Sequence, residues 1–351
     1  MKLSNFTQGK NNNFNLIRII AALAVLVDHS FALLNHAEPF KPSLGISLGF
    51  MAVDLFFIAS GFLVAGSLLT RQSLSEYVWA RVLRIYPALL LMLLLTVFVL
   101  GAIFTSLPLA SYYLHPQLYF YLMKCVTLIA GVAYYLPGVF DRNPYKGAVN
   151  GSLWTMVYEV KMYIFLGLFF WLSRFAKKQH VMLLRALILA SAAVGGVLVF
   201  IHYFYILDEN QSIRLFFMFF SGAAYWVLKD RVRLSGPIFA LLGVALLVSG
   251  LLNQQAFFAV YQFSVGYILF YLAYVPAGGI RKYNAVGDYS YGVYIYAFPV
   301  QQSVAALCPG ISVLALMGLS ALITLALAVV SWHLIEQRAL ALKKRLVAAA
   351  T

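Results

Sequence analysis

Residues 234–280 read LSGPIFALLGVALLVSGLLNQQAFFAVYQFSVGYILFYLAYVPAGGI and contain no Asp, Glu, Lys or Arg. A transmembrane helix needs about 20 consecutive apolar residues, so this stretch is long enough for two crossings joined by a tight turn. Residues 289–335 form a second stretch of the same length without Asp, Glu, Lys or Arg. The two stretches together predict a chain built from membrane-spanning helices.

The composition of the whole chain leads to the same fold class. Of its 351 residues, 63% are hydrophobic and 10% are charged, and the mean hydropathy is +0.87. Soluble globular domains carry charge on about a quarter of their residues. A cytosolic enzyme, a disordered protein and a secreted disulfide scaffold are therefore excluded. We predict an all-α polytopic integral membrane protein in which residues 1–351 form a single transmembrane domain without a fused soluble domain.

The apolar runs that are long enough to cross a bilayer can be placed along the sequence. An additional run at about 117–136 is ambiguous. We expect ten crossings, at roughly 14–35, 46–69, 86–106, 152–173, 182–204, 212–228, 236–252, 256–276, 286–306 and 312–334.

The distribution of basic residues decides the ambiguous run, because cytoplasmic loops are enriched in Lys and Arg. If 117–136 does not fully cross and the N-terminus is cytoplasmic, most basic residues lie inside. The residues placed inside are Lys2, Lys10, Arg71, Arg81, Arg84, Arg174, Lys177, Lys178, Lys229, Arg231, Arg233, Arg281, Lys282, Arg338, Lys343, Lys344 and Arg345. Those placed outside are Lys41, Arg142, Lys146, Arg214, Glu38, Asp141, Asp208 and Glu209. We therefore predict that both termini are cytoplasmic and that 107–150 is an outer-face segment with a re-entrant or interfacial helix.

A few ionisable residues fall inside the predicted crossings, where charge is costly and marks functional sites. They are Asp28 and His29 in the first crossing, Asp54 in the second, and Glu159 and Lys161 in the fourth. With a helical rise of about 1.5 Å per residue, the acids and the imidazole fall in one band at the midplane or slightly outside it. This common depth predicts a shared polar cavity.

Three arginines predict a positive entrance below that cavity. Arg18 precedes His29 by 11 residues, which is close to three helical turns and ~16 Å along the axis, so the two side chains share a face. Arg81 and Arg84 are three residues apart, on one face at the inner start of the third crossing. A positive mouth below a deep histidine suits a long ligand with phosphates at one end and a reactive group at the other, such as a coenzyme A thioester.

The fourth crossing begins with a polar stripe. Ser152, Thr155 and Glu159 are spaced by three and four residues and therefore share one helix face. Trp154 is expected at the outer membrane interface, where indole rings are favoured. We expect this stripe to line the acceptor side of the cavity.

Lys161 lies about 200° around the helix from Glu159, so these two residues cannot pair within their own helix. Its partner is expected to be Asp28 or Asp54, and the sequence does not distinguish the two. Each ionisable residue also has a structural interpretation, since basic residues can anchor topology or extend to the interface. The functional interpretation rests on how these groups combine.

Several of these residues belong to motifs that resemble those of the membrane-bound acyltransferase-3 family. The matching segments extend from residue 15 to about 345, follow the family's order, and are weak singly but specific together. They are RIIAALAVLVDH (18–29, an Arg–ten residues–His signature), GFMAVDLFFIASGFLV (49–64), RVLRIYP (81–87), NGSLWTMVYEVKMY (150–163), DYSYGVYIYAFPV (288–300) and WHLIEQ (332–337).

This resemblance implies roles for individual residues. His29 matches the family's essential histidine, Glu159 its helix glutamate, and Arg18, Arg81 and Arg84 its donor-associated arginines. Tyr291, in the segment 288–300, is assigned to the cavity on the same basis. Many members carry a histidine later in that segment, where this chain has Ala297, so that histidine cannot be general to the chemistry.

The expected function is O-acyl transfer, with acetyl as the acyl group by family frequency. The resemblance implies that acyl-coenzyme A binds from the cytoplasm and that a glycan or lipid-linked sugar is modified outside the inner (plasma) membrane of a bacterial cell. A hydroxyl needs a positioned base, and histidine has an ordinary pKa of about 6.5. His29 is expected to deprotonate the acceptor or to form a transient acyl-histidine, with Asp28 or Glu159 orienting the ring. The arginines are expected to bind the donor phosphates.

Other partners and functions follow from the same residues. No permanently bound cofactor, no metal and no nucleic acid are expected, because two cysteines are too few for a structural zinc site and the basic clusters are explained by topology. A proton-coupled transporter or flippase is the main alternative, because buried acids beside a histidine also form proton relays. A structural or assembly subunit is the third class.

Overall fold

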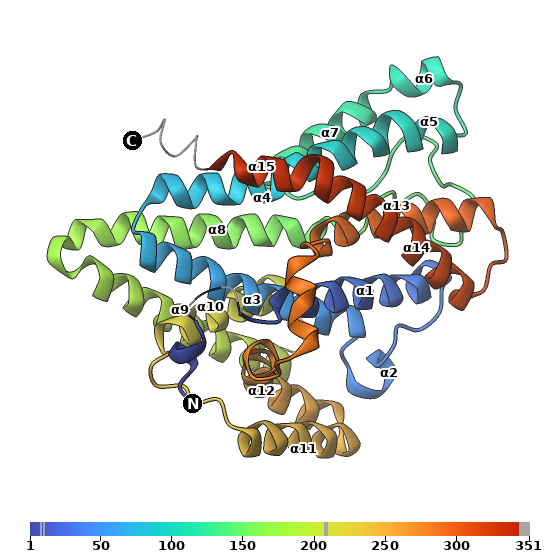
Figure 1. Ribbon diagram of the computed structural model, residues 1–351. Coiled ribbons are helices and arrows are strands. Elements are labelled where there is room, and N and C mark those ends of the chain that lie inside the picture. Colours follow the sequence, from blue (N-terminus) through green and yellow to red (C-terminus); the bar gives the residue numbers. More distant parts are fainter. Residues whose placement is uncertain (8, 10, 207–209, 344–351) are drawn as a thin grey trace. The chain divides into compact units, whose positions relative to one another are not determined.

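The computed structural model describes residues 1–7, 9, 11–206 and 210–343 (Figure 1). These residues form helices and, apart from three isolated bridges, no β-structure, so the predicted all-α class is confirmed for the part that is described. Five charged residues of the topology argument lie outside the described residues, namely Lys10, Asp208, Glu209, Lys344 and Arg345.

The helices follow one another through most of the chain. They are α1 (Phe14–Leu33), α2 (Lys41–Leu44), α3 (Leu48–Arg71), α4 (Leu74–Leu94), α5 (Gly101–Phe104), α6 (Leu109–Tyr113), α7 (Pro116–Thr127), α8 (Trp154–Ser173), α9 (His180–Ile201), α10 (Gln211–Val227), α11 (Gly236–Leu252), α12 (Gln254–Tyr274), α13 (Ser290–Leu307), α14 (Val313–Ser331) and α15 (Gln337–Ala341). Three π-helical segments extend α4, α9 and α14, at Leu95–Leu100, His202–Ile206 and Trp332–Glu336. Three 3₁₀ segments complete the list, at Leu3–Phe6, Arg174–Gln179 and Gly279–Ala285.

The number of membrane crossings is confirmed only in part. Within the described ranges, 6 helical segments are long and apolar enough to cross a membrane. Each of the ten predicted crossings overlaps a helix, but the segment Trp154–Ile206 contains both α8 and α9, which a non-helical residue at Lys177 separates. Helices α10 and α11 have 17 residues each, which is short for a crossing. The protein is therefore a polytopic membrane protein, and the count of ten crossings stays a prediction.

Helix α4 begins earlier than the sequence predicted. The third crossing was expected from residue 86, whereas α4 starts at Leu74 and runs through Pro87. The Ser73 hydroxyl accepts the backbone N–H of Glu76 at 3.3 Å, which caps the first turn of the helix. Arg81 and Arg84 consequently lie inside the helix and not at its start. The hydropathy pattern does not indicate residues 74–85 because these turns are helical but carry charged side chains.

The segment 107–150 contains a short helix, as expected. Helix α7 has 12 residues, a length of about 18 Å, which is less than the ~30 Å of a bilayer core. Pro116 occupies its first turn, and Nδ1 of His115 accepts the N–H of Gln117. Tyr119 and Phe120 are exposed on its surface. The placement of this segment at the outer face stays a prediction.

The chain forms two compact units, each made of separate segments. Unit 1 comprises Met1–Ala21, Phe40–Tyr77 and Met162–Gly287, and unit 2 comprises Ala22–Pro39, Val78–Lys161 and Asp288–Thr351. Helices α1, α4 and α8 contribute residues to both units. The expectation of one transmembrane domain stays a prediction.

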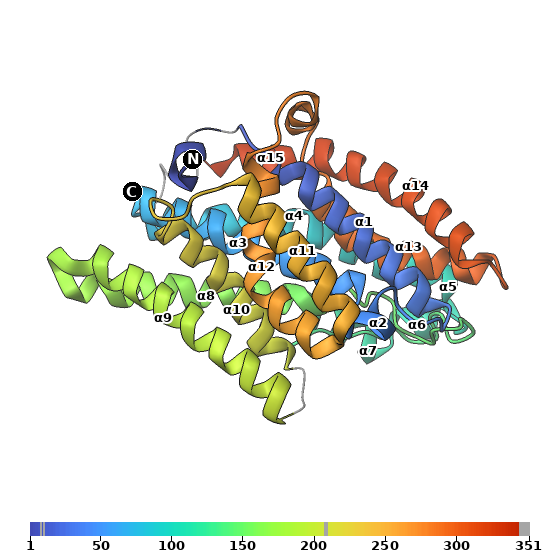
Figure 2. The ribbon, with the colours of Figure 1, turned by 90° about the horizontal axis from the view of Figure 1, so that it is seen from below.

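In unit 1, helix α10 packs against both α3 and α9, and α11 packs against α12 (Figures 1 and 2). The backbones of α3 and α10 are in contact at two glycines. A Cβ on Gly61 would lie 1.8 Å from the carbonyl oxygen of Phe219, and one on Gly222 would lie 1.9 Å from that of Ile58. Such close approach through small residues is how helices associate where the hydrophobic effect between them is weak.

In unit 2, helix α13 packs against α14 and is the most deeply buried element. Its buried residues include Tyr294, Gln301 and Gln302, so polar groups run through the interior of this unit. The Gln302 side chain donates to the carbonyls of Tyr145 and Ala148 at 2.9 and 2.7 Å, and thereby ties the 128–153 segment to α13. This framework holds the candidate site.

Candidate functional site

The structure places most of the predicted site residues in one unit. Unit 2 contains Asp28, His29, Arg81, Arg84, Ser152, Trp154, Thr155, Glu159, Lys161 and Tyr291. Arg18 and Asp54 belong to unit 1. The described residues contain no group of three or more His, Cys, Asp or Glu that could hold a metal ion.

His29 lies on the half of α1 that belongs to unit 2, and an aromatic ring holds it in place. The Phe298 ring of α13 meets the imidazole edge-on, with the ring centroids 5.2 Å apart. In the part of the chain that the structure describes, the buried Nδ1 of His29 has no hydrogen-bond partner. The imidazole is therefore oriented by packing, and neither Asp28 nor Glu159 bonds to this nitrogen.

Two further contacts fix the surroundings of His29. The Gln301 side chain of α13 donates to the carbonyl of Leu26 at 2.8 Å and to the hydroxyl of Ser30 at 2.6 Å, residues that flank His29 on α1. On the other side, a Cβ at position 151 would lie 2.5 Å from the Phe298 ring, so only glycine leaves room for that ring. Gly151 and Gln301 thus position His29 through its neighbours.

The predicted polar stripe at the start of α8 does face other polar groups. The hydroxyls of Thr155 and Tyr294 lie within hydrogen-bond distance of each other, and each lies 3.2 Å from the carbonyl oxygen of Ser152. The two hydroxyl protons are therefore shared among these three oxygens. Asn150 joins the same network, accepting from the N–H of Ser152 and donating to the carbonyl of Ile295. This network connects the beginning of α8 with α13 inside unit 2.

Arg84 is the centre of an ion-pair cluster that the sequence did not predict. Its guanidinium lies 2.7 Å from a carboxylate oxygen of Asp288 and 3.7 Å from one of Glu336. It also lies over the Tyr291 ring, 5.4 Å from the centroid. Glu159 is close enough to interact electrostatically with both Arg84 and Tyr291.

This cluster accounts for the burial of Arg84. The side chain is 14% exposed, and that of Glu336 is 2% exposed. Buried charges need partners of opposite sign and further hydrogen bonds. Glu336 accepts a hydrogen bond from Ser331 at 3.1 Å, and Asp288 accepts one from Ser290. A donor phosphate that bound Arg84 would therefore share its guanidinium with two carboxylates.

Arg81 and Lys161 belong to the same unit. Arg81 is half-buried, one helical turn before Arg84 on α4. The Lys161 ammonium lies over the Tyr158 ring at 5.4 Å, and the Trp154 ring packs edge-on against the same tyrosine. Lys161 thus contacts an aromatic face.

Asp54 has a different partner from the one considered in the sequence. It is fully buried in α3 of unit 1, where one of its oxygens lies 3.5 Å from Nη1 of Arg214 and accepts the hydroxyl of Tyr261 at 3.1 Å. Within unit 1, Asp54 therefore pairs with Arg214, and its suggested pairing with Lys161 of unit 2 stays a prediction. The sequence analysis counted Arg214 only among the charges on the outer side, because it lies at the outer end of the crossing expected at 212–228.

Arg18 and His29 lie on one uninterrupted helix, as predicted. Helix α1 runs from Phe14 to Leu33, so their separation is ~16 Å along the axis. The Arg18 guanidinium lies 6.0 Å from the centroid of the Phe56 ring within unit 1.

Comparison with known proteins identifies the family. The model of the Acyltransferase domain, acyltransferase type 3, matches residues 11–333. The chain belongs to the acyltransferase-3 family. The match covers α1 to α14, and with them every residue of the predicted site.

Two curated relatives match over nearly their full lengths. An "O-acetyl transferase" of Shigella phage Sf6 is 31% identical over 352 residues, which cover 94% of this chain and 96% of the relative. "Nodulation protein 10" of Rhizobium leguminosarum bv. viciae is 27% identical over 367 residues, covering 97% and 96% respectively. No solved structure matches the chain significantly.

Some of the residues that the sequence analysis missed do lie in motifs of this family. Asp288 opens the segment 288–300, and Glu336 lies in WHLIEQ. Both were passed over because they stand at the ends of apolar runs and not within them. The signal that could have found them is the pair of family motifs itself, which carry the only acids near the ends of α13 and α14 in the described chain.

Proposed function

We propose that this member of the acyltransferase-3 family is a membrane O-acyltransferase that moves an acyl group, most simply acetyl, from coenzyme A to a hydroxyl of a cell-surface glycan or lipid-linked sugar. The name of the phage relative, which shares 31% identity, supports the acetyl group. The single observation that carries the chemistry is His29, whose buried Nδ1 has no partner among the described residues and whose ring is held against Phe298. A ring held by packing keeps its nitrogens available to a substrate.

In the proposed reaction, His29 removes the proton from the acceptor hydroxyl as its oxygen attacks the thioester carbonyl carbon. The carbon–sulfur bond then breaks, and the coenzyme A thiolate leaves and takes up a proton. In the covalent variant, an imidazole nitrogen attacks the thioester first and the hydroxyl attacks the resulting acyl-histidine. General base catalysis of this kind typically contributes ~10²–10⁴ in rate.

The donor is proposed to enter from the cytoplasmic side and to place its phosphates near Arg18, Arg81 and Arg84. Arginine suits this role because its planar guanidinium binds phosphate through two parallel hydrogen bonds. No permanently bound cofactor and no metal take part in this mechanism. Arg84 enters it with its charge already balanced by Asp288 and Glu336, so its main proposed contribution is to hold the helices beside the donor.

The acceptor is proposed to approach from the outer side, past Ser152, Trp154 and Thr155. This orientation follows from the basic residues, with ten crossings and both termini in the cytoplasm of a bacterial inner membrane. Single cysteines at positions 178, 231 and 282 should react only with membrane-permeant reagents in intact cells, and a cysteine at position 141 should also react with impermeant ones. Labelling of position 178 from outside would overturn the orientation.

Acyl transfer by purified protein separates this function from transport. Full-length protein in detergent is mixed with acetyl-coenzyme A and the surface glycan extracted from cells that lack the gene, and release of the free thiol is followed. The wild type should release thiol in proportion to the acetyl found on the glycan by mass spectrometry. Glycans that are identical with and without the gene, together with no thiol release, would contradict the proposal and favour a transporter or flippase.

A further inference from the structure

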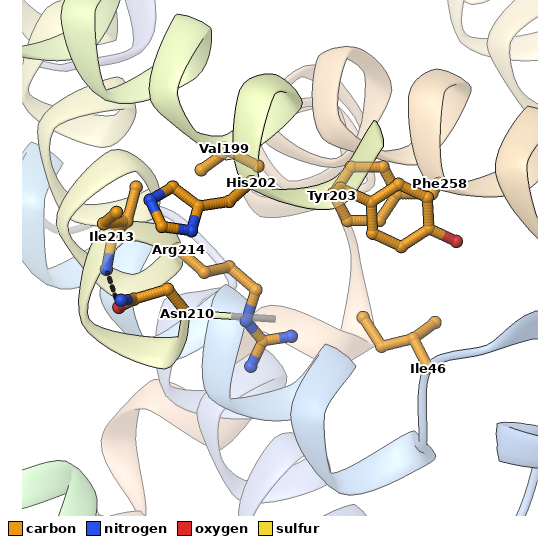
Figure 3. A pocket seen from close by; sticks show the side chains of 8 residues that line it. All are labelled: Ile46, Val199, His202, Tyr203, Asn210, Ile213, Arg214 and Phe258. Carbon is orange, nitrogen blue, oxygen red and sulfur yellow. Dashed lines mark hydrogen bonds between the residues drawn. The ribbon is translucent and has the colours of Figure 1, made fainter. Parts of the chain in front are cut away.

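A second polar site lies in unit 1, and its lining includes none of the residues assigned above to acyl transfer. A hollow forms where the π-helical end of α9 meets the first turns of α10 and α12 (Figure 3). The residues that line the hollow include Ile46, His202, Tyr203, Asn210, Arg214 and Phe258. Figure 3 shows the polar side chains on one side of the hollow and the Tyr203–Phe258 pair on the other.

Arg214 is buried in this hollow with only part of its guanidinium engaged. The residue is 7% exposed. Nη1 faces Asp54 at 3.5 Å, and one face of the group lies 4.6 Å from the centroid of the Phe50 ring. Among the described residues, Nε and Nη2 have no hydrogen-bond partner. These two nitrogens form the edge with which arginine binds a carboxylate or phosphate in bidentate fashion.

Leaving that edge unpaired is costly. A buried donor without an acceptor loses its hydration and gains nothing in return, and the loss is larger for a charged group. Asp54 does not compensate for it, since its contact with Arg214 is long and the same oxygen also accepts the Tyr261 hydroxyl. The arrangement therefore has the donors for an anionic ligand.

The rest of the hollow fits a ligand that carries such a group. The buried Nδ1 of His202 also has no partner in the described chain. Asn210 caps α10 through its side-chain oxygen, which accepts the N–H groups of Ser212 and Ile213, and the positive end of the helix dipole favours an anion there. Opposite, Tyr203 stacks on Phe258 with centroids 3.6 Å apart, and this flat apolar wall can support a sugar ring or a lipid chain.

We propose that this hollow binds one oxyanionic group, a carboxylate or a phosphate, through the Nε–Nη2 edge of Arg214 with His202 beside it. The group can come from an acidic sugar of the acceptor or from the headgroup of a membrane lipid. In the orientation proposed above, the hollow opens outward, where an acceptor arrives. Only this direction of opening rests on the proposed function. Oxyanion binding itself needs neither donor nor acyl transfer.

Titration calorimetry of the full-length protein in a neutral detergent tests this site without acyl-coenzyme A. Glucuronate and glucose 1-phosphate are the oxyanion probes, and glucose is the neutral one. Glucuronate or glucose 1-phosphate should bind, and glucose should not bind at the same concentrations. Equal binding of glucose, or no binding of either acid, would overturn the proposal.

Matched variants assign the binding to Arg214. Arg214→Lys keeps a positive charge beside Asp54 but loses the two-nitrogen edge, so affinity for the acids should fall about tenfold or more. His202→Ala leaves the Asp54 pair intact and should weaken binding by a smaller factor. The control is Arg71→Lys, at an exposed pair with Glu76, and it should bind as the wild type does. Unchanged affinity in both Arg214→Lys and His202→Ala would overturn the site.

Two further experiments distinguish the possible sources of the oxyanionic group and separate its binding from acyl transfer. In nanodiscs, probe binding is compared between phosphatidylglycerol and phosphatidylcholine. If phosphatidylglycerol competes with the probes and phosphatidylcholine does not, the lipid headgroup is the source of the oxyanionic group. Equal probe affinity in both lipids identifies the acidic sugar. The His29→Ala variant should bind the probes as the wild type does. Loss of acyl transfer in this variant, with intact probe binding, would show that the two proposals can be tested independently.

Discussion

Two arginines that are largely shielded from solvent, one in each unit, show how the same side chain can be used in different ways. Arg84 in unit 2 contacts two carboxylates and lies over a tyrosine ring, so its charge is balanced from several directions. Arg214 in unit 1 faces one carboxylate at 3.5 Å, and its Nε–Nη2 edge has no partner among the described residues. A saturated guanidinium joins helices, whereas an incompletely paired one can bind a ligand. Burial alone does not distinguish the two roles.

The largest effect is expected when the saturated arginine is removed. Arg84→Ala leaves the buried Glu336 and the partly buried Asp288 without their cation, and breaking a buried pair typically costs about 3–5 kcal/mol. The folded, membrane-inserted fraction and its melting temperature in detergent measure this loss. Arg71→Ala is the control, because its pair with Glu76 is exposed and should contribute about 0–1 kcal/mol. A stable Arg84→Ala protein that only loses donor affinity would show that Arg84 is a ligand residue and not a clamp.

Arg81 should behave differently from Arg84, although it lies one turn away on α4. Arg81→Ala should fold normally and weaken acetyl-coenzyme A binding ~10–150-fold, the equivalent of one charge-assisted hydrogen bond. Lysine at this position should rescue the affinity only in part, since it keeps the charge and loses the fork. Calorimetric titration of the purified variants measures this. Full rescue by lysine would mean that Arg81 serves only as a topology anchor.

The smallest effect on ligand affinity is expected at the acid beside Arg214. Asp54→Asn keeps the shape of the side chain and an oxygen that can accept the Tyr261 hydroxyl, but it removes the charge that competes for the guanidinium. Affinity for glucuronate should therefore rise, by about tenfold, which is the equivalent of ~1.4 kcal/mol. The corresponding change in unit 2, Glu336→Gln, should leave glucuronate binding unchanged. Weaker binding by Asp54→Asn would indicate that Asp54 holds Arg214 in its binding position.

The sequence predicted the helices well where apolar residues alone define them. Helix α1 was expected at 14–35 and spans Phe14–Leu33, and α11 was expected at the bounds it has. The early start of α4 was missed because its first turns are charged, and a hydropathy pattern does not register a helix whose charges are paired or capped. The membrane-spanning class and the short α7 were predictable because both follow from length and composition.

The ion pairs could not be predicted in the same way. Arg84 and Asp288 are separated by 204 positions in the chain, and nothing in either local sequence specifies the other. Asp54 was correctly singled out as a buried acid, but its partner Arg214 was counted only among the outer charges because it lies at the outer end of a predicted crossing. A single sequence indicates which residues are unusual, whereas the partners of those residues depend on how the helices pack.

The acceptor-activating role of His29 is the central claim, and it is tested most directly by comparing His29→Ala with His36→Ala in the purified protein. His36 lies in the exposed loop after α1 and serves as the matched control. Thiol release from acetyl-coenzyme A in the presence of glycan should fall ~10²–10⁴-fold in His29→Ala, with donor affinity and melting temperature unchanged, and should be normal in His36→Ala. Wild-type turnover by a folded His29→Ala protein would contradict both the direct and the covalent route.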